Sequence, residues 1–538
     1  MDRRAFVGLG LAATALAATA SAGANSASKG TAAVAILDAG VAEQQAAMAA
    51  GTLTAHALAT QYLARIAAID KRGPAINAII ELNPDALEIA RGLDRERAAG
   101  KLRGPLHGIP VLLKDNIATA DKMSTSAGSL ALDGVRARRD AFVAARLRAA
   151  GAVILGKTNL SEWANMRSTH SISGWSGRGG LTRNPYALDR NTSGSSSGSG
   201  AAIAASLATL AVGTETDGSI VSPASTCGLV GIKPTLGLIS RSGIIPIAAA
   251  QDTAGPMTRT VRDAALMLAA MAGADPQDAI TGAAGAVAAQ ASAHATHYAK
   301  ALVPGGLRGK RLGVARNFFG SADGVDAVIE QALAVLKAEG AILVDVNVPN
   351  TDKYNDSETA VLLYEFKPGL AAWLADYAPH APVHNMAELV AFNLKNSREM
   401  RFFGQEHLQK SQEKGDLAEQ AYLDALANNH RYARAEGIDQ VLQEHQLDAL
   451  VAPTGGVAWL TDFINGDHYG GSFSSPAAVA GYPHITVPAG FSNALPVGLS
   501  FVGTAFTEAA LIGMAYGYEQ ASHARCAPTF AASVNLRA

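Results

Sequence analysis

A tract of glycine and serine in the middle of the chain is the segment best suited to chemistry. Residues 191–200 read Asn-Thr-Ser-Gly-Ser-Ser-Ser-Gly-Ser-Gly, and a helix is predicted over 201–207. A second polar segment, residues 213–221, directly follows the apolar run 210–212. Backbone N–H groups at the start of a helix can hold an anion or a developing oxyanion. A flexible linker is the alternative, but the tract runs straight into apolar, structured segments, which favours a site loop.

Three short motifs point to other chemistries, and the neighbouring residues argue against each. Residues 194–198 match the G-x-S-x-G elbow of α/β-hydrolases, but the polar residues 190–192 precede them where the elbow needs an apolar strand. Residues 151–158 match the letters of a phosphate-binding loop, but Ala-Val-Ile-Leu at the variable positions indicates a strand. Residues 411–414 match S-x-x-K, but charged neighbours indicate a solvated helix face.

No pattern in the sequence predicts a metal or a cofactor. The 13 histidines are scattered, and the close pair His294 and His297 lacks nearby carboxylates. Cys227 and Cys526 are too few for a disulfide-rich scaffold or a four-cysteine zinc site. A single bridge between them would need an oxidising compartment, and the apolar surroundings of Cys227 favour a buried free thiol. We therefore expect neither a cofactor nor a metal.

Ordered blocks along nearly the whole chain resemble the amidase signature family. In detail the sequence is most similar to the bacterial peptide amidases of that family, through residues 171–175 and 243–247 and through Gln251-Asp252-Thr253. So many blocks in one order make a chance match very improbable. The family blocks are 108–116, 156–163, 182–186, 194–200, 213–220, 231–235 and 252–257.

The resemblance implies a set of site residues. Lys114 would be the catalytic base, Ser195 the bridging hydroxyl after a cis Gly194–Ser195 peptide bond, and Ser219 the nucleophile. The oxyanion hole would be formed by the backbone N–H groups of Thr216, Asp217, Gly218 and Ser219. Many members carry Asp and Arg where this chain has Glu215 and Val221, so we do not expect the family's Asp–Arg contact here.

The chemistry explains why these residue types are needed. An amide is a poor electrophile, so a serine hydroxyl must be activated by a base that later returns a proton to the leaving nitrogen. Lysine serves only when it is neutral, and its usual pKa is about 10.4. Lys114 follows three apolar residues at the end of a predicted strand, where burial would lower its pKa. Lys157 and Lys233 are the rival bases, and we expect them to stabilise loops or helix ends instead.

The elements that must position these residues alternate between helix and strand, which predicts an α/β layered fold. The resemblance implies one large domain over residues 31–530, with a twisted mixed β-sheet covered by helices on both faces. A flexible stretch is expected near 281–299 and a mainly helical variable region near 353–447. Helices are predicted at 54–69, 83 onward, 140–150, 261–272 and 325–339, and strands at 76–82, 108–113, 152–155, 312–315, 342–348, 447–453 and 485–488.

Residues 1–30 have the features of an export signal. Arg3 and Arg4 are followed by Phe6, the uncharged apolar run 7–18 and small residues suited to cleavage, as in a twin-arginine signal. The run is shorter than the about 20 residues that span a bilayer. An ordinary N-terminal helix is the alternative. If the signal is real, the protein acts in the periplasm or outside the cell.

The composition suits a globular enzyme with an ample core. Of 538 residues, 49% are hydrophobic and 17% charged, and the net charge of -2 gives no reason to expect nucleic acid or membrane as a partner. The resemblance implies a peptide or small-molecule amide and water as partners, and a reaction that releases ammonia from C-terminal peptide amides. The alternatives are a non-catalytic secreted binding protein of the same fold and an amidotransferase A-type subunit. The intact triad residues argue against the first and the predicted signal against the second.

Overall fold

The computed structural model of the protein describes residues 36–281 and 298–534. The predicted export signal, residues 1–30, and most of the predicted flexible stretch 281–299 lie outside the described residues. Within the described residues, one 11-stranded sheet runs in the order β1-β3-β2-β6-β8-β7-β12-β13-β11-β9-β10. The same residues contain no helix that is both long enough and apolar enough to cross a membrane.

The sheet is mixed, as predicted. Strands β3, β2 and β6 are parallel to one another, as are β11, β9 and β10, while β8, β7, β12 and β13 run antiparallel to their neighbours. A separate hairpin pairs β4 (Trp175–Ser176) with β5 (Gly180–Leu181). The strands of the large sheet are β1 (Ile79–Leu82), β2 (Pro110–Lys114), β3 (Val153–Thr158), β6 (Leu210–Glu215), β7 (Val230–Lys233), β8 (Thr253–Thr258), β9 (Arg311–Ala315), β10 (Ile342–Val346), β11 (Ala449–Pro453), β12 (His484–Ser492) and β13 (Leu495–Val502).

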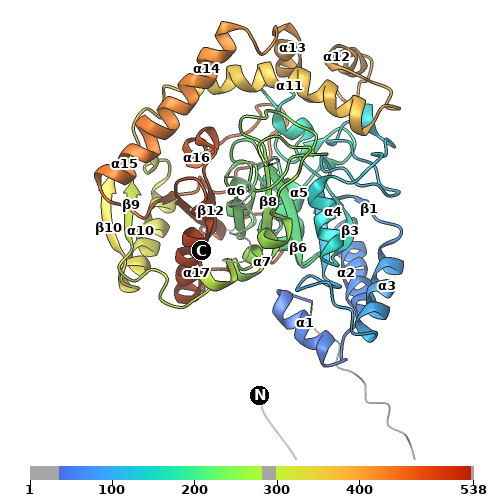
Figure 1. Ribbon diagram of the computed structural model, residues 1–538, viewed down its shortest axis with the longest axis horizontal. Coiled ribbons are helices and arrows are strands. Elements are labelled where there is room, and N and C mark those ends of the chain that lie inside the picture. The colour runs from blue at the N-terminus through green and yellow to red at the C-terminus, as the bar shows by residue number, and fades with distance from the viewer. Residues whose placement is uncertain (1–35, 282–297, 535–538) are drawn as a thin grey trace, which may run out of the picture. The chain divides into compact units, whose positions relative to one another are not determined.

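Helices flank this sheet (Figure 1). Two groups pack on it: α5 contacts α6, and α17 contacts both α7 and α10. The helices are α1 (Val41–Ala49), α2 (Ala55–Ile69), α3 (Ala86–Ala98), α4 (Phe142–Ala149), α5 (Ser197–Ala204), α6 (Val221–Thr226), α7 (Val261–Met271), α9 (Tyr298–Ala301), α10 (Asp323–Ala338), α11 (Asn355–Tyr377), α12 (Met386–Leu394), α13 (Glu406–Glu413), α14 (Gln420–His430), α15 (Asp439–Glu444), α16 (Ser474–Ala480) and α17 (Glu508–Ser522), with a π-helical segment at Arg431–Ile438.

Most predicted elements are present, with shifted ends. The Thr54 side chain accepts a hydrogen bond from the Ala57 N–H, so it caps α2 as predicted. The predicted β-α-β unit after residue 311 is confirmed as β9, α10 and β10, with β9 and β10 parallel. The strand predicted to end at 155 continues through Thr158. This extension confirms that residues 151–158 are not a phosphate-binding loop.

The predicted start of the helix after the glycine-serine tract was wrong. It begins at Ser197, not at residue 201, so the last part of the tract is helical. The backbone just before β1, at Ala78, and just after β3, at Asn159, lies against the first turn of this helix. A Cβ on Gly198 would come within 2.3 Å of the Ala78 carbonyl oxygen and within 2.5 Å of that of Asn159. Glycine is therefore required at this position by close backbone approach.

Two further expectations concern single residues. Cys227 is buried and Cys526 exposed, and both are free thiols, as favoured. Residues 411–414 lie at the end of α13, where Gln412 and Glu413 are exposed. Ser411 differs from the prediction of a solvated face, because its side chain is buried against the rest of the helical region. The serine of this S-x-x-K match is therefore not accessible to a substrate.

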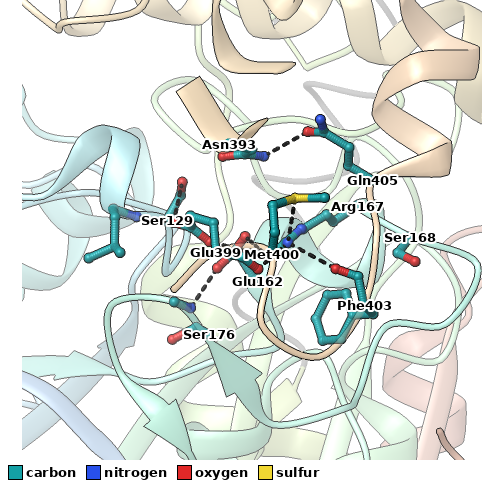
Figure 2. Close-up of polar contacts among 12 residues, drawn as sticks. Ser129, Glu162, Arg167, Ser168, Ser176, Asn393, Glu399, Met400, Phe403 and Gln405 are labelled. Carbon is teal, nitrogen blue, oxygen red and sulfur yellow. Dashed lines mark hydrogen bonds and ion pairs between the residues drawn. The ribbon is translucent and has the colours of Figure 1, made fainter. Parts of the chain in front are cut away.

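The helical region of residues 353–447, confirmed as α11 to α15, forms an arc along one margin of the sheet (Figure 1). A buried ion cluster ties it to the part of the chain that follows β3 (Figure 2). The Arg167 guanidinium lies 2.8 Å from the Glu162 carboxylate and 3.2 Å from that of Glu399, and all three side chains are fully buried. Glu399 also accepts a hydrogen bond of 2.6 Å from the Leu130 N–H. The turn before α13 is therefore held to the core by charge-assisted hydrogen bonds.

Candidate active site

The topology gathers polar side chains at one edge of the sheet. Because β3, β2 and β6 are parallel, their carboxyl ends meet at the same edge, where α/β proteins place their sites. This brings Lys114, the last residue of β2, next to Thr214 and Glu215 at the end of β6. Ser219 follows β6 within a few residues, in the turn before α6.

Lys114 is fully buried, and its amine makes three hydrogen bonds. Nζ donates to Ser195 Oγ at 2.7 Å, to Thr214 Oγ1 at 2.9 Å and to the Thr214 carbonyl oxygen at 3.2 Å. The Asn116 side-chain amide donates to the same Thr214 hydroxyl at 2.9 Å, which fixes that hydroxyl. The predicted Lys114–Ser195 pair is thus brought together, and Thr214 is a third member that the sequence did not single out.

Burial lowers the pKa of Lys114 to about 7, although the nearby carboxyl groups of Asp252 and Glu215 act in the opposite direction. All five residues of β2 are buried, so the amine has no route to bulk water along its own strand. Desolvation therefore outweighs attraction to the carboxyl groups. A substantial fraction of the amine is neutral near pH 7.

Ser195 and Ser219 lie on neighbouring segments. The Gly194–Ser195 peptide bond is cis, as the resemblance implies. The Ser195 carbonyl oxygen accepts from the Ser161 N–H at 3.1 Å, and the next residue's N–H, that of Ser196, donates to the Ser219 carbonyl oxygen at 3.2 Å. Ser195 is fully buried, whereas Ser219 keeps 7% of its surface exposed. Of the two residues, only Ser219 retains any exposed surface.

Glu215 organises the turn that carries Ser219. Its carboxylate accepts from the N–H groups of Gly218 at 3.0 Å, Ile220 at 2.7 Å and Val221 at 3.0 Å. It thereby takes up the N–H of Gly218, one of the predicted oxyanion donors. The N–H groups of Asp217 and Ser219 have no hydrogen-bond acceptor among the described residues. The sequence singled out Glu215 only as the counterpart of the family's Asp, and not as the residue that holds this turn.

The two rival lysines lie elsewhere. Lys157 Nζ donates to the Ile117 carbonyl oxygen at 2.6 Å and to the Ser124 carbonyl oxygen at 3.2 Å, so it stabilises a loop, as expected. Lys233 Nζ donates to the carbonyl oxygen of Pro234 at 3.3 Å. Burial lowers the pKa of Lys233 to about 8, while Glu215 and Glu508 oppose this. Neither lysine donates to Ser195 or Ser219.

A cavity of about 540 Å³ adjoins this edge of the sheet. Its wall includes Asn116, Thr214 and Thr216, and its apolar part comes from residues 244–247 and from Trp373 and Tyr377 of α11. Neither Ser195 nor Ser219 lines it. The cavity therefore adjoins the group of polar residues at Asn116 and Thr214.

Comparisons with known proteins fit this arrangement. The family model described as Amidase matches residues 57–512. A solved peptide amidase in complex with the competitive inhibitor chymostatin is 53% identical, with a TM-score of 0.88 over 91% of this chain and 99% of that chain. An Arabidopsis thaliana protein named "Probable amidase" is 40% identical over 490 residues, 89% of each chain.

Similarity also extends to enzymes of another reaction type. The A-type subunit of the glutamyl-tRNA(Gln) amidotransferase of Chloroflexus aurantiacus is 37% identical over 495 residues, which cover 89% of this chain and 96% of that protein. The residues matched by the family model include every strand of the large sheet and the residues at its edge. The chain therefore belongs to the amidase family and is a hydrolase acting on the C–N bonds of amides.

Proposed function

We propose that this protein is a serine amidase that removes ammonia from the C-terminal amides of peptides, with Ser219 as nucleophile, Ser195 as bridge and Lys114 as base. The observation that carries the proposal is the 2.7 Å contact between Lys114 Nζ and Ser195 Oγ in a fully buried environment. A neutral amine in that position can take a proton from a hydroxyl. A charged surface lysine could not.

The proposed reaction follows from these positions. Neutral Lys114 accepts the Ser195 proton while Ser195 accepts that of Ser219, and the Ser219 oxygen attacks the amide carbon. The N–H groups of Asp217 and Ser219, and that of Thr216, would stabilise the oxyanion. The proton then returns through Ser195 to the leaving nitrogen, and ammonia departs. Water then attacks the acyl-enzyme and gives a proton through Ser195 to Lys114. The proton returns to the Ser219 oxygen as the carboxylic acid leaves.

The peptide-amide assignment has two supports. The 53% identity to a solved peptide amidase extends over 91% of this chain. The cavity beside the site combines an apolar wall with the polar groups of Thr214 and Thr216, a mixture suited to a peptide rather than to a simple aliphatic amide. The amidotransferase resemblance is weaker, at 37% identity.

Ammonia release from a matched panel tests the proposal. The chain without residues 1–30 is incubated with a peptide amide, the same peptide as a free acid, a small aliphatic amide and glutamine. We expect ammonia from the peptide amide, more slowly from the small amide, and none from the free acid. Ser219→Ala should abolish release.

Three results would count against the proposal. No ammonia from any amide would remove the amidase assignment for this chain. Release from glutamine alone would favour the amidotransferase type of reaction over peptide deamidation. Activity retained in Ser219→Ala would place the nucleophile elsewhere.

A further inference from the structure

A buried carboxyl group lies two residues before Ser219. Asp217 Oδ2 accepts a hydrogen bond of 2.7 Å from the Ser475 hydroxyl, and the Ser474 hydroxyl also bonds to this carboxyl group. Asp217 Oδ1 is buried and receives no hydrogen bond from an N–H or a hydroxyl of the described residues. A buried carboxylate oxygen without a hydrogen-bond donor destabilises the folded protein, so a neighbouring group is expected to donate to it.

The group that faces it is a second buried carboxyl. The side chain of Glu358, in the first turn of α11, contacts that of Asp217. Glu358 Oε1 accepts from Gln251 Nε2 at 2.8 Å, and the same nitrogen donates to the Thr216 carbonyl oxygen at 3.2 Å. Gln251 therefore uses both amide protons to tie α11 to the turn of Ser219.

Two carboxylates cannot both be ionised at contact in a dry site. Burial and the charge of Asp217 raise the pKa of Glu358 well above its usual value. Burial raises the pKa of Asp217 as well, but hydrogen bonds from serine hydroxyls and the charge of Lys233 favour its ionised form, which leaves the proton on Glu358. The other titratable groups facing the pair are Glu215, Tyr354 and Tyr469, whose pKa values are raised mainly by burial and further by the charge of Asp217.

We infer that Glu358 is a positioning residue of the proposed amidase reaction, donating its proton to Asp217 and so holding the turn of residues 215–219 that presents Ser219. The inference rests on the proposed function for its link to activity. Loss of the proton would leave two facing carboxylates, whose repulsion displaces the turn and its backbone N–H donors. A displacement of about 1 Å can cost roughly 100-fold in rate.

Two substitutions of Glu358 separate the effect of its hydrogen bonds from the effect of its side-chain volume. Glu358→Gln keeps a donor for Asp217 and an acceptor for Gln251 but cannot ionise, whereas Glu358→Ala keeps neither. The matched control is Glu365→Gln, also on α11. Glu365 is buried and accepts from the Ala250 N–H at 2.9 Å and the Tyr422 hydroxyl at 2.7 Å, away from Asp217.

The test measures kcat and KM on a peptide amide from pH 5 to pH 10. We expect kcat of the wild type to decline at alkaline pH as Glu358 loses its proton. Glu358→Gln should retain kcat within a few-fold at pH 7 and should not show this decline. Glu358→Ala should lower kcat roughly 10- to 100-fold with little change in KM. Glu365→Gln should keep the wild-type profile. An alkaline decline in Glu358→Gln equal to that of the wild type, or full kcat in Glu358→Ala, would overturn the inference.

Infrared spectroscopy tests the shared proton without any turnover. The band of a protonated buried carboxyl should be present in the wild type at pH 7. The carboxyl band should be weaker in Glu358→Gln than in the wild type, which gives a negative band in the difference spectrum. Glu365→Gln should show no such difference. If the wild type releases no ammonia from any amide, the proposed function fails. The spectrum then still shows whether Glu358 carries the proton. An unchanged spectrum in Glu358→Gln overturns the inference even in an active enzyme.

Discussion

At the scale of single residues, the chemistry depends on how burial changes a lysine. Lys114 has two acidic neighbours that favour its charged form, yet burial lowers its pKa to about 7. The hydroxyl partners Ser195 and Thr214 can accept from the charged amine, and each can also donate to the neutral one. The same hydrogen bonds can therefore hold Lys114 in both protonation states.

We predict that kcat/KM on an amide rises with pH through about 7. Since only neutral Lys114 can act as base and its pKa is lowered to about 7, the reactive fraction grows about tenfold per pH unit below that value and levels off above it. Initial rates at limiting substrate between pH 5 and pH 8.5 measure this limb. A flat profile over that range would mean that Lys114 is not the base.

Lys114→Met is predicted to lower kcat by roughly 10²–10⁴-fold, the usual contribution of a general base. Methionine fills a similar volume and has no charge to desolvate, so the melting temperature should not fall markedly. Ammonia release and thermal unfolding of the same preparation measure both effects. Full activity in the folded variant would contradict the proposed role.

At the scale of elements, the site depends on segments that are far apart in the sequence. The turn after β6 is held by Glu215 from within and by Gln251, Glu358 and Ser475 from outside. The helical region is held in turn by the buried cluster of Glu162, Arg167 and Glu399 (Figure 2). Burial and Glu399 raise the pKa of Glu162, so this cluster also favours a retained proton.

Arg167→Met should destabilise the fold by about 3–5 kcal/mol, because it leaves two buried acidic groups without their cation. Urea unfolding of the purified chain measures the change. Arg398→Met is the matched control, since Arg398 precedes Glu399 directly and is exposed, and it should change stability by less than about 0.5 kcal/mol. Equal effects of the two substitutions would show that the cluster does not stabilise the helical region.

At the scale of the whole molecule, we propose that residues 1–30 direct export. The pair Arg3 and Arg4 is then required, because a twin-arginine signal is read through its arginines. We predict that the wild-type chain, expressed with its first residues in a bacterium that has the pathway, is recovered from the periplasm in a shortened form. Replacing both arginines by lysine should leave it uncleaved in the cytoplasm. Mass spectrometry of the two fractions measures this, and a full-length wild-type chain in the cytoplasm would contradict it.

The sequence by itself determined the α/β class, the family resemblance and the candidates Lys114, Ser195 and Ser219. These features depend on local patterns, such as apolar runs that end in a polar residue and fixed blocks around the glycine-serine tract. Such patterns can be recognised from the sequence alone because each lies within one continuous segment. The end of β3 was misjudged because its pairing with β1 and β2 continues to Thr158, and the start of α5 was misjudged because the sequence does not show the backbone of Ala78 and Asn159 that lies against Gly198.

Only the tertiary structure decided which groups meet. Thr214 joins Lys114 because β2 and β6 are adjacent and parallel. Glu358 meets Asp217 because Gln251 ties the first turn of α11 to the turn of Ser219. The charge state of Lys114 was likewise open until its burial was known, because desolvation depends on every neighbour that excludes water. Residue types and spacing identify the candidate catalytic side chains. Their contacts with distant segments and their burial away from water determine their pKa values and therefore their reactivity.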